Sequence, residues 1–164
     1  CGPWASKLVR GSEIDSDFDL TMVRGSHIFI DQKISRPYLF QESEGSRVVF
    51  VLPYQGSTLV GTTEVAQSLS DPIECSEDER AYLLSIYNNN FTEKISSSNV
   101  QSEYSGLRAI VTSSDGERNL SAASRESKIE TMDSLINIYG GKWTSAPSLS
   151  KKVLSQVEKL RSNK

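Results

Sequence analysis

Apolar and polar positions along the chain predict a fold made mainly of short strands. Residues 47–52 are apolar on both faces, which is typical of a central strand that is covered on both sides. Residues 58–63 follow after a short loop that contains a proline and a glycine, so the two segments predict a hairpin. Residues 34–41 contain Pro37 and predict an edge strand, which completes a three-stranded meander.

The rest of the chain carries weaker strand patterns. Strands are predicted at residues 7–10, at residues 22–31 with an interruption at Gly25-Ser26, at residues 100–112, and in a closing hairpin of residues 128–132 and 135–139. Apart from residues 7–10, the first twelve residues have the glycine and proline content of a loop. Residues 113–127 are polar and also predict a loop.

Two helices accompany the strands. Ser76 and Glu79 have the spacing of a capping box, in which each side chain bonds the backbone N–H of the other residue, so a helix begins there. Its apolar stripe is Leu83, Leu84, Tyr87 and Phe91. A second helix is predicted from about Ala146, with Pro147 in its first turn. Because strands and helices do not alternate, the pattern predicts an α+β fold with a mainly antiparallel sheet and flanking helices.

Length and charge exclude several classes of protein. The 164 residues suffice for one domain, so we interpret residues 1–164 as a single domain. The net charge of -3, from 18 basic and 21 acidic residues, argues against nucleic acid as a partner, because phosphate backbones need a basic surface. Cys1 and Cys75 lack the spacing of a metal site or a disulfide framework, which favours a reducing compartment and no metal. No apolar run approaches the roughly 20 residues that cross a bilayer.

The segment Gly140-Gly141-Lys142 is the first candidate for chemistry. It follows a predicted strand and precedes a helix, and its two glycines allow a backbone to approach a ligand closely. The start of the helix presents N–H groups and a partial positive charge, to which Lys142 adds a full charge. This turn therefore predicts an anionic or electron-rich ligand.

His27 and Arg108 are the other candidates. His27, the only histidine, is suited to act as a general base near neutral pH, and a structural histidine is the alternative. Arg108 stands in a predicted apolar strand, so its guanidinium needs either a protein partner or a ligand, and its planar fork suits phosphate or carboxylate. Arg125, in a polar loop, is by itself a surface charge. The chain has no Gly-x-Gly-x-x-Gly and no P-loop, so it lacks the common nucleotide fingerprints.

Six segments, in this order, resemble those of the FAD-dependent glycerol-3-phosphate dehydrogenases, a branch of the D-amino-acid-oxidase-like flavoproteins. They are Gly2-Pro3-Trp4, Arg24-Gly25-Ser26-His27, Val51-Leu52-Pro53-Tyr54 with Leu59-Val60-Gly61-Thr62-Thr63, Tyr104-Ser105-Gly106-Leu107-Arg108, Ser124-Arg125-Glu126 and Gly140-Gly141-Lys142-Trp143-Thr144. The chain departs at Ser145-Ala146-Pro147, where the family usually has Thr-Tyr-Arg. The family's N-terminal FAD-binding Rossmann half and its C-terminal helical domain are absent, so we expect a fragment of a longer protein.

The resemblance implies that the parent enzyme oxidises sn-glycerol 3-phosphate to dihydroxyacetone phosphate. Hydride would pass from C2 to FAD, and the electrons would pass on to quinone or another acceptor. It implies that His27 and Arg108 are catalytic and that Arg108, Arg125 and Lys142 bind substrate. The implied cofactor contacts are Gly2, Gly140, Gly141, Lys142, Trp143 and Thr144.

The same resemblance makes this chain the substrate-binding part of that enzyme. We expect the fragment to be inactive by itself and the parent to be cytoplasmic, with peripheral association with the inner membrane left open. Two alternatives stay open. One is a related amino-acid or hydroxy-acid oxidase in which Arg108 holds a carboxylate, and the other is an anion-binding module without enzyme activity.

Overall fold

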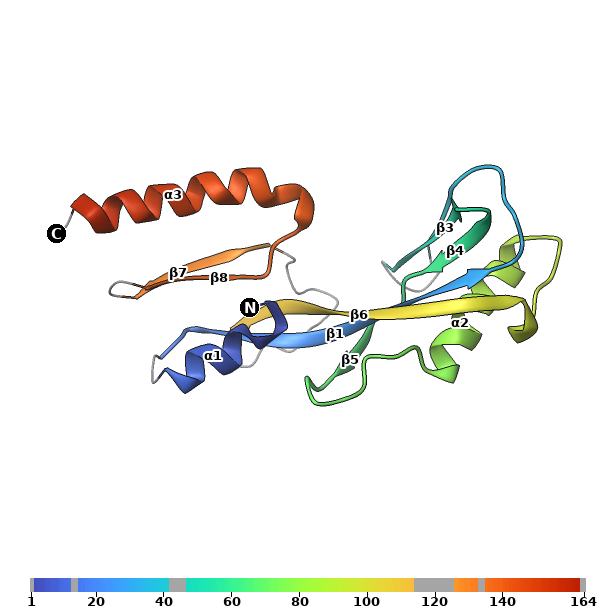
Figure 1. Ribbon diagram of the computed structural model, residues 1–164, viewed down its shortest axis with the longest axis horizontal. Coiled ribbons are helices and arrows are strands. Elements are labelled where there is room, and N and C mark those ends of the chain that lie inside the picture. The colour runs from blue at the N-terminus through green and yellow to red at the C-terminus, as the bar shows by residue number, and fades with distance from the viewer. Residues whose placement is uncertain (1, 13–14, 42–46, 114–125, 133–134, 163–164) are drawn as a thin grey trace. The chain divides into compact units, whose positions relative to one another are not determined.

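The computed structural model describes residues 2–12, 15–41, 47–113, 126–132 and 135–162 (Figure 1). The chain divides into two compact units. Unit 1 comprises Cys1–Met22 and Ala109–Lys164, and unit 2 comprises Val23–Arg108. Two long strands, β1 (Phe18–Ile30) and β6 (Val100–Ser113), contribute residues to both units.

Unit 2 is built on an antiparallel meander. Its strands, besides β1 and β6, are β2 (Tyr38–Gln41), β3 (Val48–Tyr54), β4 (Ser57–Gly61) and β5 (Val65–Gln67). The order in the sheet is β2-β3-β4-β1-β5, and β6 pairs with β1. The pairs β2–β3, β3–β4 and β4–β1 are antiparallel. The predicted hairpin and meander are confirmed, and β2 ends this strand order, as the proline before it indicated.

Helix α2 (Glu77–Asn90) packs against one face of this sheet, which we name the reverse face. The predicted capping box is present, since the Glu79 N–H donates to Ser76 Oγ at 3.3 Å and the Ser76 N–H donates to Glu79 Oε2 at 3.0 Å. The helix buries Leu83, Leu84 and Tyr87 against apolar side chains of three strands: Ile28, Ile30, Val49, Val51 and Val60. Because side chains alternate along a strand, the neighbours of these residues face the other way, onto the front face.

Unit 1 contains the predicted closing hairpin and last helix. Its elements are η1 (Gly2–Trp4), α1 (Ala5–Gly11), β7 (Lys128–Met132), β8 (Leu135–Tyr139), η3 (Trp143–Ser145) and α3 (Ala146–Ser162). Strands β7 and β8 pair antiparallel, and α3 begins at Ala146, both as predicted. The Tyr139 side chain is 1% exposed, and its hydroxyl lies 3.0 Å from Ser16 Oγ and 3.3 Å from Glu130 Oε2. None of the described helices has the length and apolar character needed to cross a membrane.

Two local predictions were wrong. The first residues, predicted as a loop with a strand at 7–10, form η1 and helix α1 instead, and Val9 is the one residue of α1 that is buried. The interruption at Gly25-Ser26 does not exist, because β1 runs unbroken through both residues. Gly25 keeps strand geometry, and its missing side chain leaves space for the side chains of Arg108 and Thr62. Most of the predicted loop at 113–127 lies outside the described residues.

Candidate functional site

A group of residues from β1, from the end of β4 and the position after it, and from β6 gathers in unit 2. We name it the front-face cluster: Gly25, His27, Gly61, Thr62, Tyr104 and Arg108. Alternation along β1 places His27 opposite to Ile28, which is buried under α2. Residues 104, 106 and 108 share one face of β6 for the same reason. The cluster therefore lies on the front face, away from the core of unit 2.

The position of the His27 ring is closely defined by its neighbours. It stacks on Tyr104 with ring centroids 4.7 Å apart and an interplanar angle of 2°. Its partner across the β1–β4 ladder is Gly61. A Cβ placed on Gly61 would lie 2.1 Å from His27 Cδ2, so the ring occupies the space that any other residue would fill. Glycine is therefore required at position 61 for this ring position.

The environment of His27 keeps the imidazole neutral. Burial lowers the pKa of His27, and the positive charge of Arg108 lowers it further. The ordinary histidine pKa is 6.5, so His27 is neutral at pH 7. Its Nδ1 is buried and has no hydrogen-bond partner in the described part of the chain. A neutral imidazole carries one nitrogen lone pair and can accept a proton.

Arg108 lies beside His27 and has protein partners. Its Nη2 donates to Thr62 Oγ1 at 2.8 Å, and its Nη1 bonds Glu64 Oε1 at 3.2 Å. A Cβ on Gly25 would lie 2.4 Å from Arg108 Nη2 and 2.6 Å from Thr62 Oγ1. Gly25 thus makes room for the guanidinium. The sequence predicted that Arg108 binds either a protein partner or a ligand. The structure supplies the partner and leaves the side chain 30% exposed.

The glycine turn lies in unit 1. Gly140 and Gly141 have φ values of 65° and 94°, in the left-handed region that favours glycine. The Lys142 N–H donates to Ser145 Oγ at 3.1 Å, which closes the first turn of η3 directly before α3. Lys142 and Thr144 are exposed, and the side chain of Trp143 is 95% exposed. The predicted glycine turn followed by a helix start is confirmed.

The predicted site residues do not all fall in one unit. His27 and Arg108 belong to unit 2, whereas Gly2, with φ 54°, and the glycine turn with Lys142 belong to unit 1. Arg125 lies outside the described residues. The convergence of Arg108, Arg125 and Lys142 on one substrate stays a prediction.

Comparison with known proteins identifies the family. The family model described as FAD dependent oxidoreductase matches residues 1–154. The chain belongs to this family. This match confirms the resemblance to D-amino-acid-oxidase-like flavoproteins that the six segments indicated.

Individual relatives of this chain agree with that assignment. The chain is 30% identical to D-erythritol 1-phosphate dehydrogenase of Brucella abortus, over 96% of this chain and 32% of the relative. It is 28% identical to the aerobic glycerol-3-phosphate dehydrogenase of Escherichia coli, over 95% of this chain and 32% of the relative. The chain therefore spans about a third of the length of the curated relatives it matches.

One solved structure confirms the predicted fold class. The glycerol-3-phosphate dehydrogenase of Bacillus halodurans, complexed with FAD, superimposes with a TM-score of 0.78 at 24% identity. The match covers 97% of this chain and 31% of the other. At this identity the likeness shows the shared fold.

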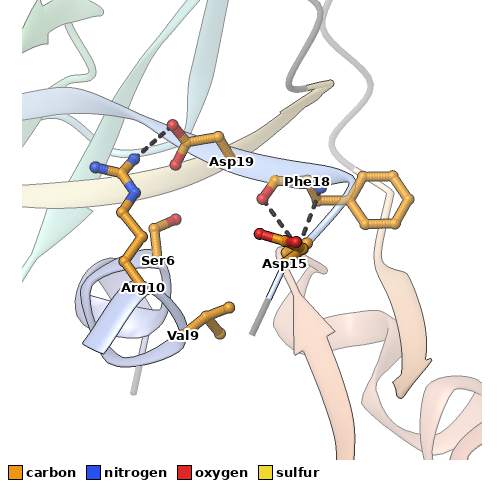
Figure 2. A pocket seen from close by; sticks show the side chains of 7 residues that line it. Ser6, Val9, Arg10, Asp15, Phe18 and Asp19 are labelled. Carbon is orange, nitrogen blue, oxygen red and sulfur yellow. Dashed lines mark hydrogen bonds and ion pairs between the residues drawn. The ribbon is translucent and has the colours of Figure 1, made fainter. Parts of the chain in front are cut away.

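A cavity of about 250 Å³ lies in unit 1 (Figure 2). It is lined by Ser6, Val9, Arg10, Asp15, Ser16, Phe18 and Asp19. Arg10 Nη2 bonds Asp19 Oδ2 at 2.6 Å at its edge, as the dashed line in Figure 2 shows. The two side chains neutralise each other, and none of the predicted site residues lines this cavity.

Four residues of the front-face cluster were not predicted as site residues, although all lie in the quoted segments: Gly25, Gly61, Thr62 and Tyr104. A glycine inside a strand pattern signals a close approach of another group, and this signal could have identified Gly61. Glu64, which pairs with Arg108, gave no such signal. Its role depends on a contact between residues 44 positions apart in the sequence.

Proposed function

We propose that this chain is the substrate-binding part of a longer flavoenzyme that oxidises sn-glycerol 3-phosphate to dihydroxyacetone phosphate. The observation that carries the proposal is the front-face cluster. There a neutral histidine and an arginine lie side by side on neighbouring strands β1 and β6. Family membership supports redox chemistry, and the dehydrogenases to which the chain is similar suggest the class of substrate, a polyol phosphate.

Arg108 binds the phosphate group of the substrate in this proposal. A guanidinium presents several N–H donors in one plane, and phosphate oxygens accept two of them in parallel. Thr62 and Glu64 fix the orientation of the fork, which reduces the entropy lost on binding. Arg125 and Lys142 are proposed as further contacts to the substrate.

His27 accepts the proton of the substrate's C2 hydroxyl group. Because its pKa is below the ordinary value, the imidazole is in the proton-accepting form at neutral pH. Stacking on Tyr104 holds the ring in one plane, so its nitrogen atoms keep a fixed direction. Arg108 stays protonated throughout, since its guanidinium does not titrate near neutral pH.

The glycine turn fits a flavin. Gly140 and Gly141 carry no side chains that would shield the backbone, and Lys142 supplies an exposed positive charge beside a helix start. We propose that Gly2, Gly140, Gly141, Lys142, Trp143 and Thr144 hold FAD in the full-length enzyme. When bound, FAD supplies the acceptor for the hydride that leaves C2. We propose quinone or another acceptor as the final oxidant.

A substrate panel tests the proposal on the full-length protein. We expect reduction of an electron-accepting dye with glycerol 3-phosphate, and none with D-alanine or 2-hydroxyglutarate. D-erythritol 1-phosphate is a second candidate substrate, favoured by the relative that is 30% identical. A preference for the amino acid or the hydroxy acid would contradict the phosphate-binding role of Arg108 and favour the oxidase alternative.

The pH dependence tests the role of His27. The neutral form is the active one, so kcat/KM is expected to be level at pH 7 and above. It should fall as the pH drops below 6.5 through the lowered pKa of His27. Steady-state rates between pH 4.5 and 8 measure this, and the residual activity of the His27→Gln variant should lack the acidic fall. A fall of the same midpoint in that variant would assign the titration to another group.

A further inference from the structure

The reverse face of unit 2 carries a buried carboxylate directly behind the front-face cluster. Glu79 is 4% exposed. Its Oε1 accepts hydrogen bonds from Ser26 Oγ at 2.8 Å and from Thr63 Oγ1 at 2.6 Å. Its Oε2 accepts from Arg24 Nη2 at 2.6 Å and from the Ser76 N–H at 3.0 Å. One carboxylate thus joins strand β1, the segment after β4 and the start of α2.

A third hydroxyl group joins this network from β6. Ser105 Oγ lies 2.7 Å from Ser26 Oγ. Since Ser26 donates its only hydroxyl proton to Glu79, Ser105 must be the donor in that contact. Ser26 and Thr63 are also joined through the backbone, because the Ser26 N–H donates to Thr63 Oγ1 at 2.8 Å and the Thr63 N–H donates to the Ser26 carbonyl at 3.3 Å.

Each of these three hydroxyl residues is the direct neighbour in sequence of a member of the front-face cluster. Ser26 precedes His27, Thr63 follows Thr62, and Ser105 follows Tyr104. Side chains that alternate across a sheet share one backbone, so a hydroxyl held on the reverse face fixes the position of its neighbour on the front face.

We infer that Glu79 is a positioning residue for the proposed reaction, because its carboxylate holds the backbones that carry His27, Tyr104 and Thr62, the residue that orients Arg108. The inference rests on the proposed function of the front-face cluster. Of the two carboxylate oxygens, the capping box of α2 uses only Oε2, so it does not account for the two hydroxyl bonds at Oε1.

The network requires the charged form of Glu79. Burial by itself would raise the pKa of Glu79. The hydrogen bonds from Thr63, Arg24, the Ser76 N–H and Ser26 outweigh it and lower the pKa to about 2. A glutamine at this position would place an NH₂ donor where the carboxylate now accepts, so two donors would face each other. Arg24, whose side chain is only 12% exposed, would also lose its charge partner.

The chain offers a matched pair of variants for the test. Thr63→Val removes the hydroxyl that bonds Glu79, and Thr63 is 2% exposed. Thr58→Val makes the same change in β4 at a residue that is 0% exposed and whose hydroxyl donates to the Gln32 carbonyl at 2.6 Å. Thr58 has no bond to Glu79 among the described contacts. Both variants lose a buried hydroxyl group, and only one touches the network.

We expect Thr63→Val to lower kcat of the full-length enzyme by about tenfold or more, because small displacements of reacting groups are costly. Thr58→Val should change kcat by less than about twofold, although both variants lower the unfolding temperature. Ser105→Ala and Glu79→Gln should follow Thr63→Val, and Ser105→Ala keeps the test valid if Glu79→Gln does not fold. Equal kcat and KM in Thr63→Val and Thr58→Val would overturn the inference.

The inference and the proposed function fail in different ways. If wild-type enzyme prefers another substrate, the proposed function fails, and the variants are then compared on that substrate. A crystal structure of Thr63→Val gives a readout without any substrate. A displaced His27–Tyr104 stack or Thr62–Arg108 bond supports the positioning role, and an unchanged front-face cluster contradicts it.

Discussion

Replacing Arg108 with glutamine in the full-length enzyme is expected to lower kcat/KM for glycerol 3-phosphate by about 10²- to 10³-fold. In the proposed reaction the change removes the charged, planar donor that binds phosphate, and loss of such a contact typically costs about 3–4 kcal/mol of transition-state binding. The proposal has the phosphate bound before and during the reaction, so the rise in KM should exceed the fall in kcat. Steady-state rates over a range of substrate concentrations separate the two.

Arg80 provides a matched control for that variant. It also belongs to unit 2, its side chain is 28% exposed against 30% for Arg108, and it also pairs with a glutamate. Its Nε and Nη2 each lie 2.9 Å from a carboxylate oxygen of Glu103. Arg80→Gln should leave kcat/KM within about twofold, as expected for an exposed ion pair. Equal losses in the two variants would mean that Arg108 acts only through a structural ion pair.

The elements that sequence predicted best are those whose signals are local. The capping box depends on Ser76 and Glu79, three positions apart, and it begins α2 where predicted. The β3–β4 hairpin depends on two apolar runs and the turn between them. The Gly140-Gly141 turn depends on residues whose positive φ values only glycine adopts readily. In each case the residues that determine the structure stand within one short window.

The predictions failed where distant contacts decide the local structure. Helix α1 has no side-chain hydrogen bond at its N-cap residue, Trp4, so it lacks the local signal that marked α2. Gly25 resembled a break in a strand, because the side chain that occupies its space, Arg108, lies 83 positions later. The space beside Gly25 is filled by Arg108 only because β1 and β6 pair in the sheet.

Glu79 illustrates how one local role conceals another. The capping box already accounts for this residue, and no local pattern around it signals further partners. Arg24 and Ser26, which bond its carboxylate, lie 55 and 53 positions away. The resemblance to flavoproteins identified Arg24-Gly25-Ser26-His27 as one segment. In the structure, Arg24 and Ser26 of this segment face the network on the reverse face, whereas Gly25 and His27 belong to the cluster on the front face.

Replacing Gly61 with alanine should separate the geometry of His27 from its chemistry, because the imidazole itself is kept. The added methyl would lie 2.1 Å from His27 Cδ2 and 2.6 Å from its Cγ, so the ring must leave its stack on Tyr104. We expect kcat to fall by about 10²-fold, since a proton acceptor moved by about 1 Å no longer meets the hydroxyl group. The overpacking should also lower the free energy of unfolding by about 1–3 kcal/mol.

Two further glycines of unit 2 make this experiment decisive. An alanine Cβ at Gly106 would meet nothing within 4 Å, so Gly106→Ala should leave kcat and KM unchanged, although it lies between Tyr104 and Arg108 on β6. An alanine at Gly25 would displace the Arg108 guanidinium and should raise KM more than it lowers kcat. If Gly61→Ala kept wild-type kcat, His27 would not be the proton acceptor. If Gly25→Ala and Gly61→Ala gave the same kinetic pattern, phosphate binding and proton acceptance would not be divided between Arg108 and His27.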